Sequence, residues 1–332
     1  MLRILLRVLV VLVGLILVMI LAGPFLISGH PSAGLASPRA AATSESRFIE
    51  IPFAGTDGLA IHYVERAATT GPSATAFVLL HGFTFNAWTW QPVLESFAAR
   101  GQVVAYDQVP YGLSDKPLRT AWAGPNPYSK EAAITQLIAV LDTLGIERAI
   151  LVGNSSGGTL ALEAALAYPE RVAGLILVAP WVYATRPTLP EWVASLPQLR
   201  RLSLLIARKL GEGAPLLDLS YADPERISAE RLEQFENHRR VAGWDLAWGE
   251  LLTVSLSTPV TVSAQLAEVR VPVLMISGDQ DQLVPIEDSR RVAAELPQAR
   301  FVELADCGHA PQEECPEAFR AAVNAWLDAY AL

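Results

Sequence analysis

The chain has 332 residues, enough for two average domains or for one α/β domain that carries an insertion. Its 34 acidic and 25 basic residues give a net charge of −9, which argues against nucleic-acid binding and offers no general attraction for anionic substrates. An uncharged substrate and, because aliphatic residues are abundant, a sizeable buried core are therefore expected.

The N-terminus carries an apolar run long enough to cross a membrane. Arg3 and Arg7 precede the uncharged residues 8–27, which as a helix rising about 1.5 Å per residue would cover the roughly 30 Å hydrocarbon core of a bilayer. The run is longer than the apolar region of roughly 7 to 15 residues in a cleaved signal peptide, so we favour a retained anchor with its N-terminus inside. Small residues at 32–36 and 40–42 keep signal cleavage as the alternative. In both cases the rest of the chain is exported.

We accordingly predict a membrane segment at residues 1–28 and an unstructured linker at 29–46. Residues 48–53 and 59–64 then predict a hairpin around the turn 55–58. Further along, short apolar runs predict strands that are buried on both faces. They cover residues 76–80, 103–106, 149–152, 175–178, 273–276 and 301–304.

Helical patterns separate most of these strands. Ser129 can cap a helix that ends at Gly145, and a second apolar stripe lies at the C-terminus. That stripe consists of Phe319, Val323, Trp326, Leu327 and Tyr330. The alternation predicts right-handed βαβ units and a mainly parallel sheet with helices on both faces.

One connection, residues 181–270, is far longer than an ordinary connection of roughly 2 to 6 residues. Its helical patterning and tryptophans predict a helical cap domain. Within it, Arg200, Arg201, Arg208 and Lys209 alternate with aliphatic residues. This pattern fits an amphipathic helix, for which a solvated face is favoured over contact with lipid.

The most informative motif is Gly-Asn-Ser-Ser-Gly at residues 153–157. It lies between a predicted strand and the helix-forming run 159–167, which is the strand–turn–helix setting of a nucleophile elbow. The glycines permit a turn too tight for a Cβ atom, and that turn would lift the Ser155 hydroxyl above the sheet. Ser155 is therefore a candidate nucleophile.

From about Phe48 to the C-terminus the chain resembles the α/β-hydrolase superfamily, through this elbow and through His81-Gly82-Phe83 after the strand 76–80. The resemblance implies an α/β-hydrolase fold, with a mostly parallel central sheet, helices on both faces and a helical cap insertion. The core would comprise residues 47–180 and 271–332, and the cap 181–270. The backbone N–H groups of Phe83 and Ser156 would form the oxyanion hole, while the His81 side chain is structural.

The resemblance also places the base at His309, in the segment Cys-Gly-His-Ala-Pro at residues 307–311. A serine hydroxyl is a weak nucleophile near neutral pH, and a histidine titrates in the range needed to activate it. For the acid, the family pattern Gly-x-x-Asp followed by an apolar–Pro step selects Asp281 over Asp279. The order Ser155, Asp281, His309 is that of this fold.

Other candidates carry weaker claims. Asp107 resembles a loop aspartate that organises a turn, and His62 and His238 are interpreted as structural. Cys307 and Cys315 fit no metal motif, and an unpaired, half-buried Cys307 is favoured over a disulfide between them. Several aromatic residues could line an apolar substrate pocket, although some must be ordinary core. These are Trp88, Trp90, Trp181, Tyr183, Trp244 and Trp248.

We therefore expect hydrolysis of an uncharged, hydrophobic carboxylic ester through an acyl-enzyme, with a small-molecule substrate and neither metal nor organic cofactor. Carbon–carbon bond hydrolases are the main rival, because their elbow often has the Gly-Asn-Ser-x-Gly-Gly pattern of residues 153–158. Ala310 stands where those enzymes would have a tryptophan. Peptidase, thioesterase and perhydrolase activities stay open. A non-catalytic binding module would require that at least one catalytic element be broken, and we find no broken element in the sequence. The sequence leaves the oligomeric state open.

Overall fold

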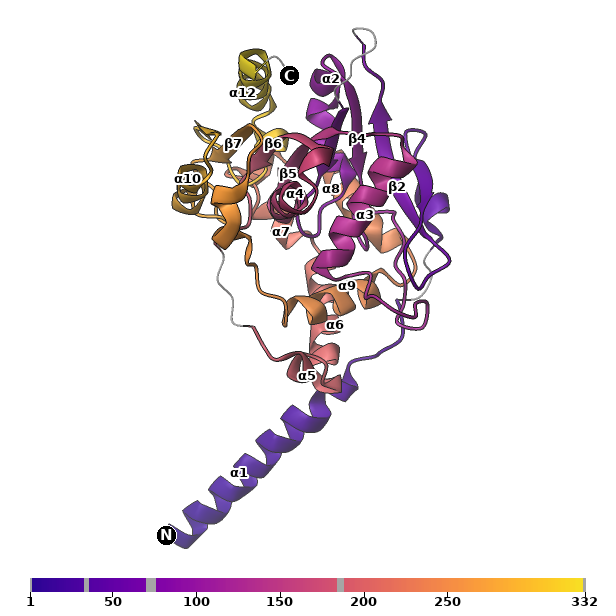
Figure 1. Ribbon diagram of the computed structural model, residues 1–332. Coiled ribbons are helices and arrows are strands. Elements are labelled where there is room, and N and C mark those ends of the chain that lie inside the picture. Colours follow the sequence, from indigo (N-terminus) through magenta and orange to yellow (C-terminus); the bar gives the residue numbers. More distant parts are fainter. Residues whose placement is uncertain (1, 33–35, 70–75, 184–187, 331–332) are drawn as a thin grey trace.

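The computed structural model describes residues 2–32, 36–69, 76–183 and 188–330, and its centre is one eight-stranded sheet (Figure 1). The strands are β1 (Arg47–Ile51), β2 (Leu59–Arg66), β3 (Ala76–Leu80), β4 (Gln102–Tyr106), β5 (Ala149–Asn154), β6 (Val172–Val178), β7 (Val273–Gly278) and β8 (Ala299–Leu304). Their order is β1-β2-β4-β3-β5-β6-β7-β8, in which only β2 pairs antiparallel with its neighbours β1 and β4. The predicted opening hairpin and mostly parallel sheet are confirmed.

The central strands are continuous apolar runs because helices cover both faces of the sheet. In β3, Val78 and Leu80 join one hydrophobic cluster, whereas Phe77 and Leu79 join a second cluster on the opposite face. β8 does not fit the prediction of a strand buried on both faces, since Leu304 is its only buried residue. Its place at the edge of the sheet explains the difference.

The helices of the core are α2 (Leu94–Ala98), α3 (Lys130–Thr143), α4 (Ser156–Ala167), α10 (Ile286–Glu295), α11 (Pro311–Glu314) and α12 (Pro316–Tyr330). α3, α4 and α10 pack in the first cluster, and α2 and α12 in the second. Ser129 caps α3 as predicted, because its hydroxyl accepts the Ala132 N–H at 3.1 Å. In the C-terminal stripe Tyr330 is exposed and the other four side chains are buried.

The chain between β6 and β7 forms a set of short helices and turns. The α-helices are α5 (Glu191–Ala194), α6 (Pro197–Gly211), α7 (Pro215–Asp218), α8 (Ala229–Phe235) and α9 (Trp244–Ser255). α6 and α9 pack on each other, and α5 and α6 lie at the end of the body nearest α1 (Figure 1). We propose that residues 181–270 act as a cap; of these, 184–187 lie outside the described residues.

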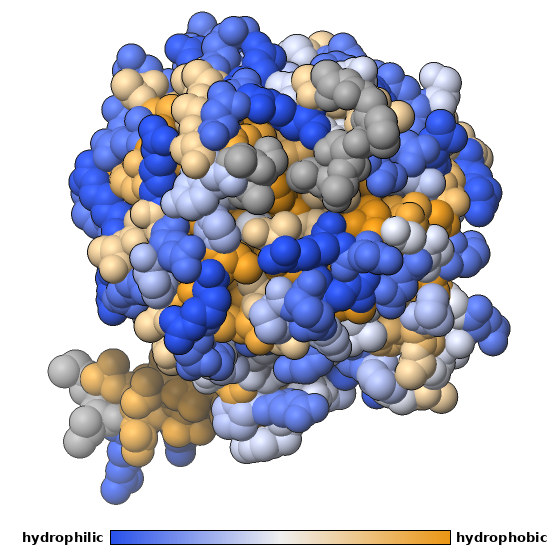
Figure 2. Space-filling model, turned by 45° about the horizontal axis from the view of Figure 1, so that its top comes forward, coloured by the Kyte–Doolittle hydropathy of each residue, from blue (hydrophilic) through white to orange (hydrophobic). Residues whose placement is uncertain are grey.

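The N-terminal helix α1 (Leu2–Ala22) projects from the body and is followed by the 3-10 turn η1 (Gly23–Leu26). By length and composition Arg3–Leu26 could cross a membrane, and its apolar window is unburied. In Figure 2 the helix is mostly hydrophobic, whereas the visible face of the body is mixed. This helix is compatible with a membrane anchor or with a signal sequence.

The linker is more ordered than the sequence suggested. A 3-10 turn, η2 (Pro38–Ala41), lies within it, and the Ala36 backbone exchanges hydrogen bonds with Arg240 and Ala242 of the insertion. These bonds give partners to backbone groups that would otherwise need water, so composition alone was misleading here. The sequence offers two possible cleavage stretches. Residues 40–42 lie at the end of η2, and in the stretch 32–36 residues 33–35 fall outside the described residues.

Candidate active site

Ser155 lies in a sharp turn between β5 and α4 at the carboxyl end of the parallel strands. Its φ of 54° and ψ of −119° are values that a residue with a Cβ atom rarely adopts. A Cβ atom on Gly153 would lie 2.4 Å from the Gly157 carbonyl oxygen, and one on Gly157 would lie 2.2 Å from that of Leu80. The two glycines therefore let the backbone close tightly enough to hold Ser155 in this strained turn.

The loop after β3 approaches this turn. A Cβ atom on Gly82 would lie 3.2 Å from the Ser155 Cβ atom, so Phe83 follows a residue in close contact with the serine. Ser156 is the first residue of α4, where backbone N–H groups lack acceptors within the helix. His81 is structural: its Nδ1 lies 2.8 Å from the Gly82 oxygen and its Nε2 accepts the Gln108 N–H at 3.0 Å. Burial lowers the pKa of His81 and keeps it neutral.

The structure pairs His309 with Asp281 and not with Asp279. Oδ2 of Asp281 lies 2.7 Å from Nδ1 of His309, and both side chains are buried. Oδ1 of Asp281 accepts the N–H groups of Leu283 and Val284 at 2.8 and 2.9 Å. Because an ionised carboxylate can only accept, Nδ1 carries the proton and Nε2 has its lone pair free to take another. Asp279 is exposed, and among the residues that the structure describes its side chain accepts a single long bond, 3.4 Å, from the Cys307 N–H.

Asn154, to which no role was assigned from the sequence, links the serine turn to the histidine loop. Its Nδ2 donates to the carbonyl oxygens of Val178 at 3.2 Å and His309 at 3.0 Å. The hydrogen bonds of the described residues include none between the Ser155 hydroxyl and the His309 ring, so Asn154 supplies the observed connection. The motif contained this asparagine, but only the folded chain shows which distant carbonyl it meets.

The loop that carries His309 is fastened by a disulfide between Cys307 and Cys315, whose Cα atoms are 6.3 Å apart. The expectation of an unpaired Cys307 is therefore wrong. The short helix α11 turns the chain back and brings the two residues into bonding range, which sequence spacing could not show. Glu314 holds the same loop, since its carboxylate accepts the N–H groups of Gly308, Ala222 and Asp223 at 2.7, 3.0 and 2.9 Å.

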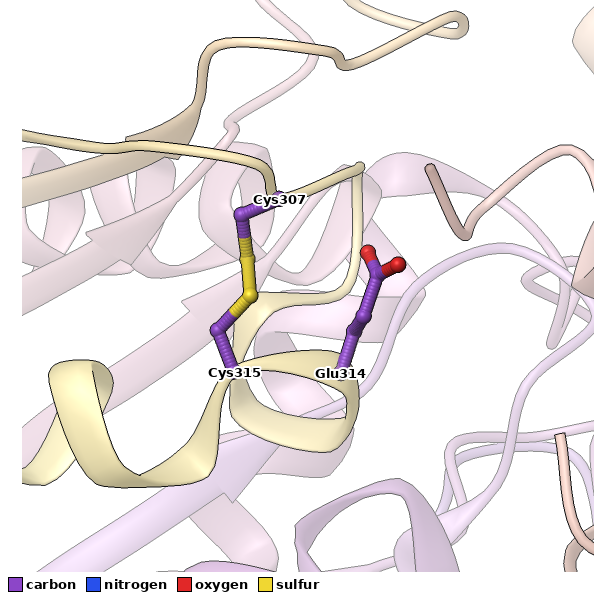
Figure 3. Close-up of side chains that lie close together, drawn as sticks. All are labelled: Cys307, Glu314 and Cys315. Carbon is purple, nitrogen blue, oxygen red and sulfur yellow. A yellow bond between two sulfur atoms is a disulfide. The ribbon is translucent and has the colours of Figure 1, made fainter. Parts of the chain in front are cut away.

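Cys307, Cys315 and Glu314 also form a cluster whose potential metal-ligand atoms lie within 4.8 Å of one another. Figure 3 shows that the two sulfur atoms are bonded to each other, with the Glu314 side chain beside them. Thiolates, the form in which cysteine binds metal, are absent from this cluster, and the carboxylate already accepts backbone N–H groups. The cluster fixes a loop and does not provide a metal site.

Asp107 organises the loop after β4, as its resemblance to a family aspartate suggested. It accepts the N–H groups of Ala87 at 2.7 Å and Leu113 at 2.6 Å, and its Oδ2 lies 2.7 Å from Nδ1 of His62. Burial alone would raise the pKa of Asp107, but its interactions with His62, with His81 and with the Ala87 N–H lower it to about 2. His62 also contacts the Ser46 hydroxyl at 2.9 Å. His62 and Asp107 are both fully buried. Ser46 follows a turn and does not have the strand–turn–helix setting of Ser155, so the His62–Asp107 pair is structural.

The structure thus pairs Asp281 with His309 and connects their loop through Asn154 to the turn of Ser155, and comparison with known proteins adds the family. The family profile described as the alpha/beta hydrolase fold matches residues 75–316, most of the chain. The chain belongs to this family. The resemblance inferred from the motifs is thereby confirmed, and so is hydrolase chemistry in general.

Among relatives, the chain is 32% identical over 289 residues to a 2-hydroxy-6-oxononadienedioate/2-hydroxy-6-oxononatrienedioate hydrolase of Paraburkholderia phymatum, covering 82% of this chain and 92% of that one. It is 29% identical over 251 residues to a Caulobacter segnis protein that carries the name of the carbamate hydrolase RutD, covering 76% and 90%. Among solved structures, a membrane phospholipase A superposes with a TM-score of 0.64 at 22% identity, covering 99% of both chains. This last likeness shows the fold alone.

The aromatic residues predicted to line a substrate pocket fall into separate groups. Trp88 and Trp90 are buried in the hydrophobic cluster packed against α12, so they are core residues and their assignment to the pocket is corrected. Trp181 and Tyr183 line a cavity of about 360 Å³ with Leu283, Val284, Pro285 and Asp288. The Trp181 N–H donates to the Ser155 carbonyl at 3.1 Å, which places this cavity near the serine turn.

A chain of aromatic contacts leads from the loop after β3 into the insertion of this hydrolase. The Phe83 ring lies 6.0 Å from that of Tyr111, and the Tyr111 ring lies 5.7 Å from that of Trp248 on α9. Trp248 stacks on His238 at 4.4 Å, and burial lowers the pKa of His238 to about 3. His238 is therefore structural, as predicted from the sequence, and the cluster that includes Tyr111 and Trp248, with Phe83 packed against it, is a buried aromatic core of the insertion.

A buried ion pair joins the insertion to the helix that follows His309. Arg231 of α8 contacts Glu313 of α11 through two nitrogens, with Nη2 at 2.8 Å from Oε1. Tyr221 donates its hydroxyl to Oε2 of Glu313 at 2.8 Å, and Thr89 donates to Oε1. This pairing was not predicted, because neither residue belongs to a sequence motif.

Proposed function

We propose that this α/β hydrolase is a serine hydrolase that cleaves uncharged, hydrophobic carboxylic esters through an acyl-enzyme. The observation that carries the proposal is the buried Asp281–His309 pair, whose loop is tied by Asn154 to the strained turn that presents Ser155. A strained backbone and a buried carboxylate that contacts an imidazole are costly to assemble at one place, and catalysis accounts for both.

In the proposed mechanism Ser155 Oγ attacks the ester carbonyl carbon while Nε2 of His309 takes the hydroxyl proton. Asp281 stabilises the resulting imidazolium without accepting the proton. The backbone N–H groups of Phe83 and Ser156 donate to the carbonyl oxygen as it gains negative charge, and loss of one such donor typically costs about 2.7–4 kcal/mol. His309 then protonates the leaving alcohol, and water, activated by the same nitrogen, releases the acid.

The cavity beside the serine turn supports an uncharged, apolar substrate, because Trp181, Tyr183, Leu283, Val284 and Pro285 line it and its carboxylate, Asp288, would repel an anion. The cation of Arg231 does not change this, since Glu313 already neutralises it. A specific observation favours carbon–carbon bond hydrolysis as the second candidate: a relative named for a dienedioate substrate is 32% identical to this chain. Ala310, which is fully buried, stands where we expect a tryptophan in that class.

Two measurements test the proposal. A fluorophosphonate should label Ser155 in the folded protein, and absence of the adduct would favour a non-catalytic binding module. A series of p-nitrophenyl esters of graded chain length, assayed beside a vinylogous diketone, should show turnover of the esters with a preference for apolar acyl groups. Turnover of the diketone alone would replace ester cleavage by carbon–carbon cleavage.

We also propose that α1 is a retained anchor that holds the catalytic part outside the cytoplasm, with secretion after signal cleavage as the alternative. The exposed apolar span Arg3–Leu26 supports insertion into a bilayer. The full chain should stay with membranes after a carbonate wash, and a chain that starts near Ser44 should be soluble and active. Release of a shortened form into the medium would show that the segment is cleaved.

A further inference from the structure

We propose that the helices α5 and α6 of this hydrolase rest on the lipid bilayer that α1 crosses, so that the insertion is a membrane-contacting surface. The proposal rests on the proposed anchoring by α1. The surface, called the α5–α6 face below, consists of the exposed apolar residues Trp192, Leu196, Leu202, Leu205 and Ile206.

The first observation is that α6 is bonded to the end of the membrane segment. Gln198 donates to the Leu21 carbonyl at 3.4 Å, and Arg201 donates to the Ile27 carbonyl at 2.9 Å. Arg208 donates to the Ser28 and His30 carbonyls at 2.9 and 2.8 Å. These carbonyls follow or end a helix, so they have no partner within it, and donors on α6 satisfy them. The bonds place α6 beside residues 21–30, at the level where the chain leaves the hydrocarbon.

The second observation is the division of α6 into two sides. Ser203, Leu204, Ala207 and Gly211 are buried against the body. Leu202, Leu205 and Ile206 are exposed, and Leu205 shares a side with Arg201 and Arg208, four residues before it and three after it. Leu205 therefore lies on the side that meets the membrane segment, between two arginines that bind its carbonyls, and Leu202 and Ile206 continue the exposed surface away from the buried side. Leucine and isoleucine flanked by arginine is the composition of a helix lying in a membrane interface.

The third observation is that α5 extends the same surface. Trp192 is 73% exposed and Leu196 is 41% exposed, and α5 packs against α6 beside the end of α1 (Figure 1). Tryptophan is enriched at the headgroup level of membranes, where its ring has an apolar body and a polar N–H group. Single exposed apolar residues need no explanation, but five on two adjoining helices and the short link between them, at the exit of an apolar span, do.

Because the α5–α6 face lies beside the end of the membrane segment, lipid is the partner that we propose for it. A helix in a membrane interface buries its apolar side roughly 5–10 Å into the boundary between headgroups and acyl chains. With α1 inserted through Leu26 and α6 bonded to Ile27 and Ser28, the α5–α6 face adjoins the point at which the chain leaves the membrane. A second copy of the chain or another protein would have to displace lipid to cover it.

The test uses the full chain in vesicles of phosphatidylcholine and phosphatidylglycerol, with a nitroxide spin label on single introduced cysteines. Leu205→Cys and Ile206→Cys probe the face, and Leu15→Cys probes the middle of α1. Leu232→Cys on α8 is the matched control, because Leu232 is 40% exposed and Leu205 is 39% exposed. The unsubstituted chain shows how far the label reacts with the native cysteines. Equal melting temperatures establish that the variants fold.

Collision of the label with oxygen, which concentrates in lipid, is compared with collision with a water-soluble nickel chelate. We expect labels at positions 15, 205 and 206 to favour oxygen by at least several-fold and the label at 232 to favour nickel. Nickel access at 205 and 206 with oxygen preference at 15 would overturn lipid contact while leaving the anchor intact. Shielding of 205 and 206 from both reagents would mean protein contact, and nickel access at 15 would overturn the anchor as well.

Discussion

The loops at the carboxyl edge of the sheet and the insertion between β6 and β7 are held by different forces. In the loops, the carboxylates of Asp281, Asp107 and Glu314 each accept two or more backbone N–H groups. In the insertion, packing is mainly aromatic, as where Trp248 stacks on His238 and contacts Trp244. Hydrogen bonds from backbone N–H groups to a carboxylate hold the atoms of a loop in definite positions, whereas aromatic packing mainly fills the space between helices. Substitutions in the loops should therefore act on turnover and those in the insertion on stability.

The largest difference should come from the two neighbouring aspartates of the β7 loop. Asp281→Asn should preserve folding and lower kcat by several orders of magnitude, because an amide does not hold His309 in the tautomer whose Nε2 accepts a proton. A fall of about 10⁴ is known for this change in the serine-protease triad of a different enzyme. Asp279→Asn should change kcat little. Hydrolysis of a p-nitrophenyl ester at constant pH measures both.

Ser155→Ala and His309→Ala should each remove most of the turnover, and the double variant should lose little more because the residues act as a unit. A crippled Asp279→Asn enzyme beside a nearly normal Asp281→Asn enzyme would move the acid to Asp279, despite the contact between Asp281 and His309.

The insertion and the His309 loop meet at the buried ion pair between Arg231 and Glu313. Arg231→Met should lower the free energy of unfolding by about 3–5 kcal/mol, because Glu313 would stay buried with its charge unpaired. Denaturant titration measures the loss. Arg290→Met is the control, since the Arg290–Glu303 pair is exposed and its removal should leave stability unchanged within error. Equal free energies of unfolding for the two variants would mean that the buried pair contributes no more to stability than the exposed pair.

The disulfide tests whether the His309 loop needs a covalent constraint in addition to its hydrogen bonds. Cys315→Ala should lower the free energy of unfolding by about 2–3 kcal/mol, the value for closing a short loop. A reductant should destabilise the parent by a similar amount and leave the variant unchanged. Alkylation of both cysteines in denatured, unreduced protein would show that the bond is absent.

The last expected effect is an acid sensitivity located in the insertion, which is absent at neutral pH. Burial lowers the pKa of His238 to about 3, whereas an unfolded histidine titrates near 6.5. Between these values the unfolded state binds more protons, so stability should fall as the pH is lowered from about 6.5 towards 3. His238→Phe cannot titrate and should make the unfolding free energy less dependent on pH in this window. His30→Gln, at an exposed position, should keep the parent slope, and an unchanged slope in His238→Phe would contradict the assignment.

The sequence by itself determined the parts of this protein that depend on local pattern. The apolar strand runs, the cap of Ser129 on α3 and the glycine elbow of residues 153–157 were predicted because each needs only the chemistry of neighbouring residues. The family pattern also chose Asp281 over Asp279, and the structure pairs Asp281 with His309. The role of that pair in turnover stays a prediction.

Tertiary structure decided what depends on residues brought together from distant segments. The Cys307–Cys315 disulfide is possible because α11 reverses the chain. Trp88 and Trp90 are core residues because they pack in one cluster with α12. Asn154 donates to the His309 carbonyl, which lies far away in the sequence. The linker was likewise misjudged from composition, and the backbone partners of Arg201 and Arg208 on α6 could not be predicted, since they come together only in the fold. Local pattern fixes which face of a segment is apolar, and only packing fixes what that face meets.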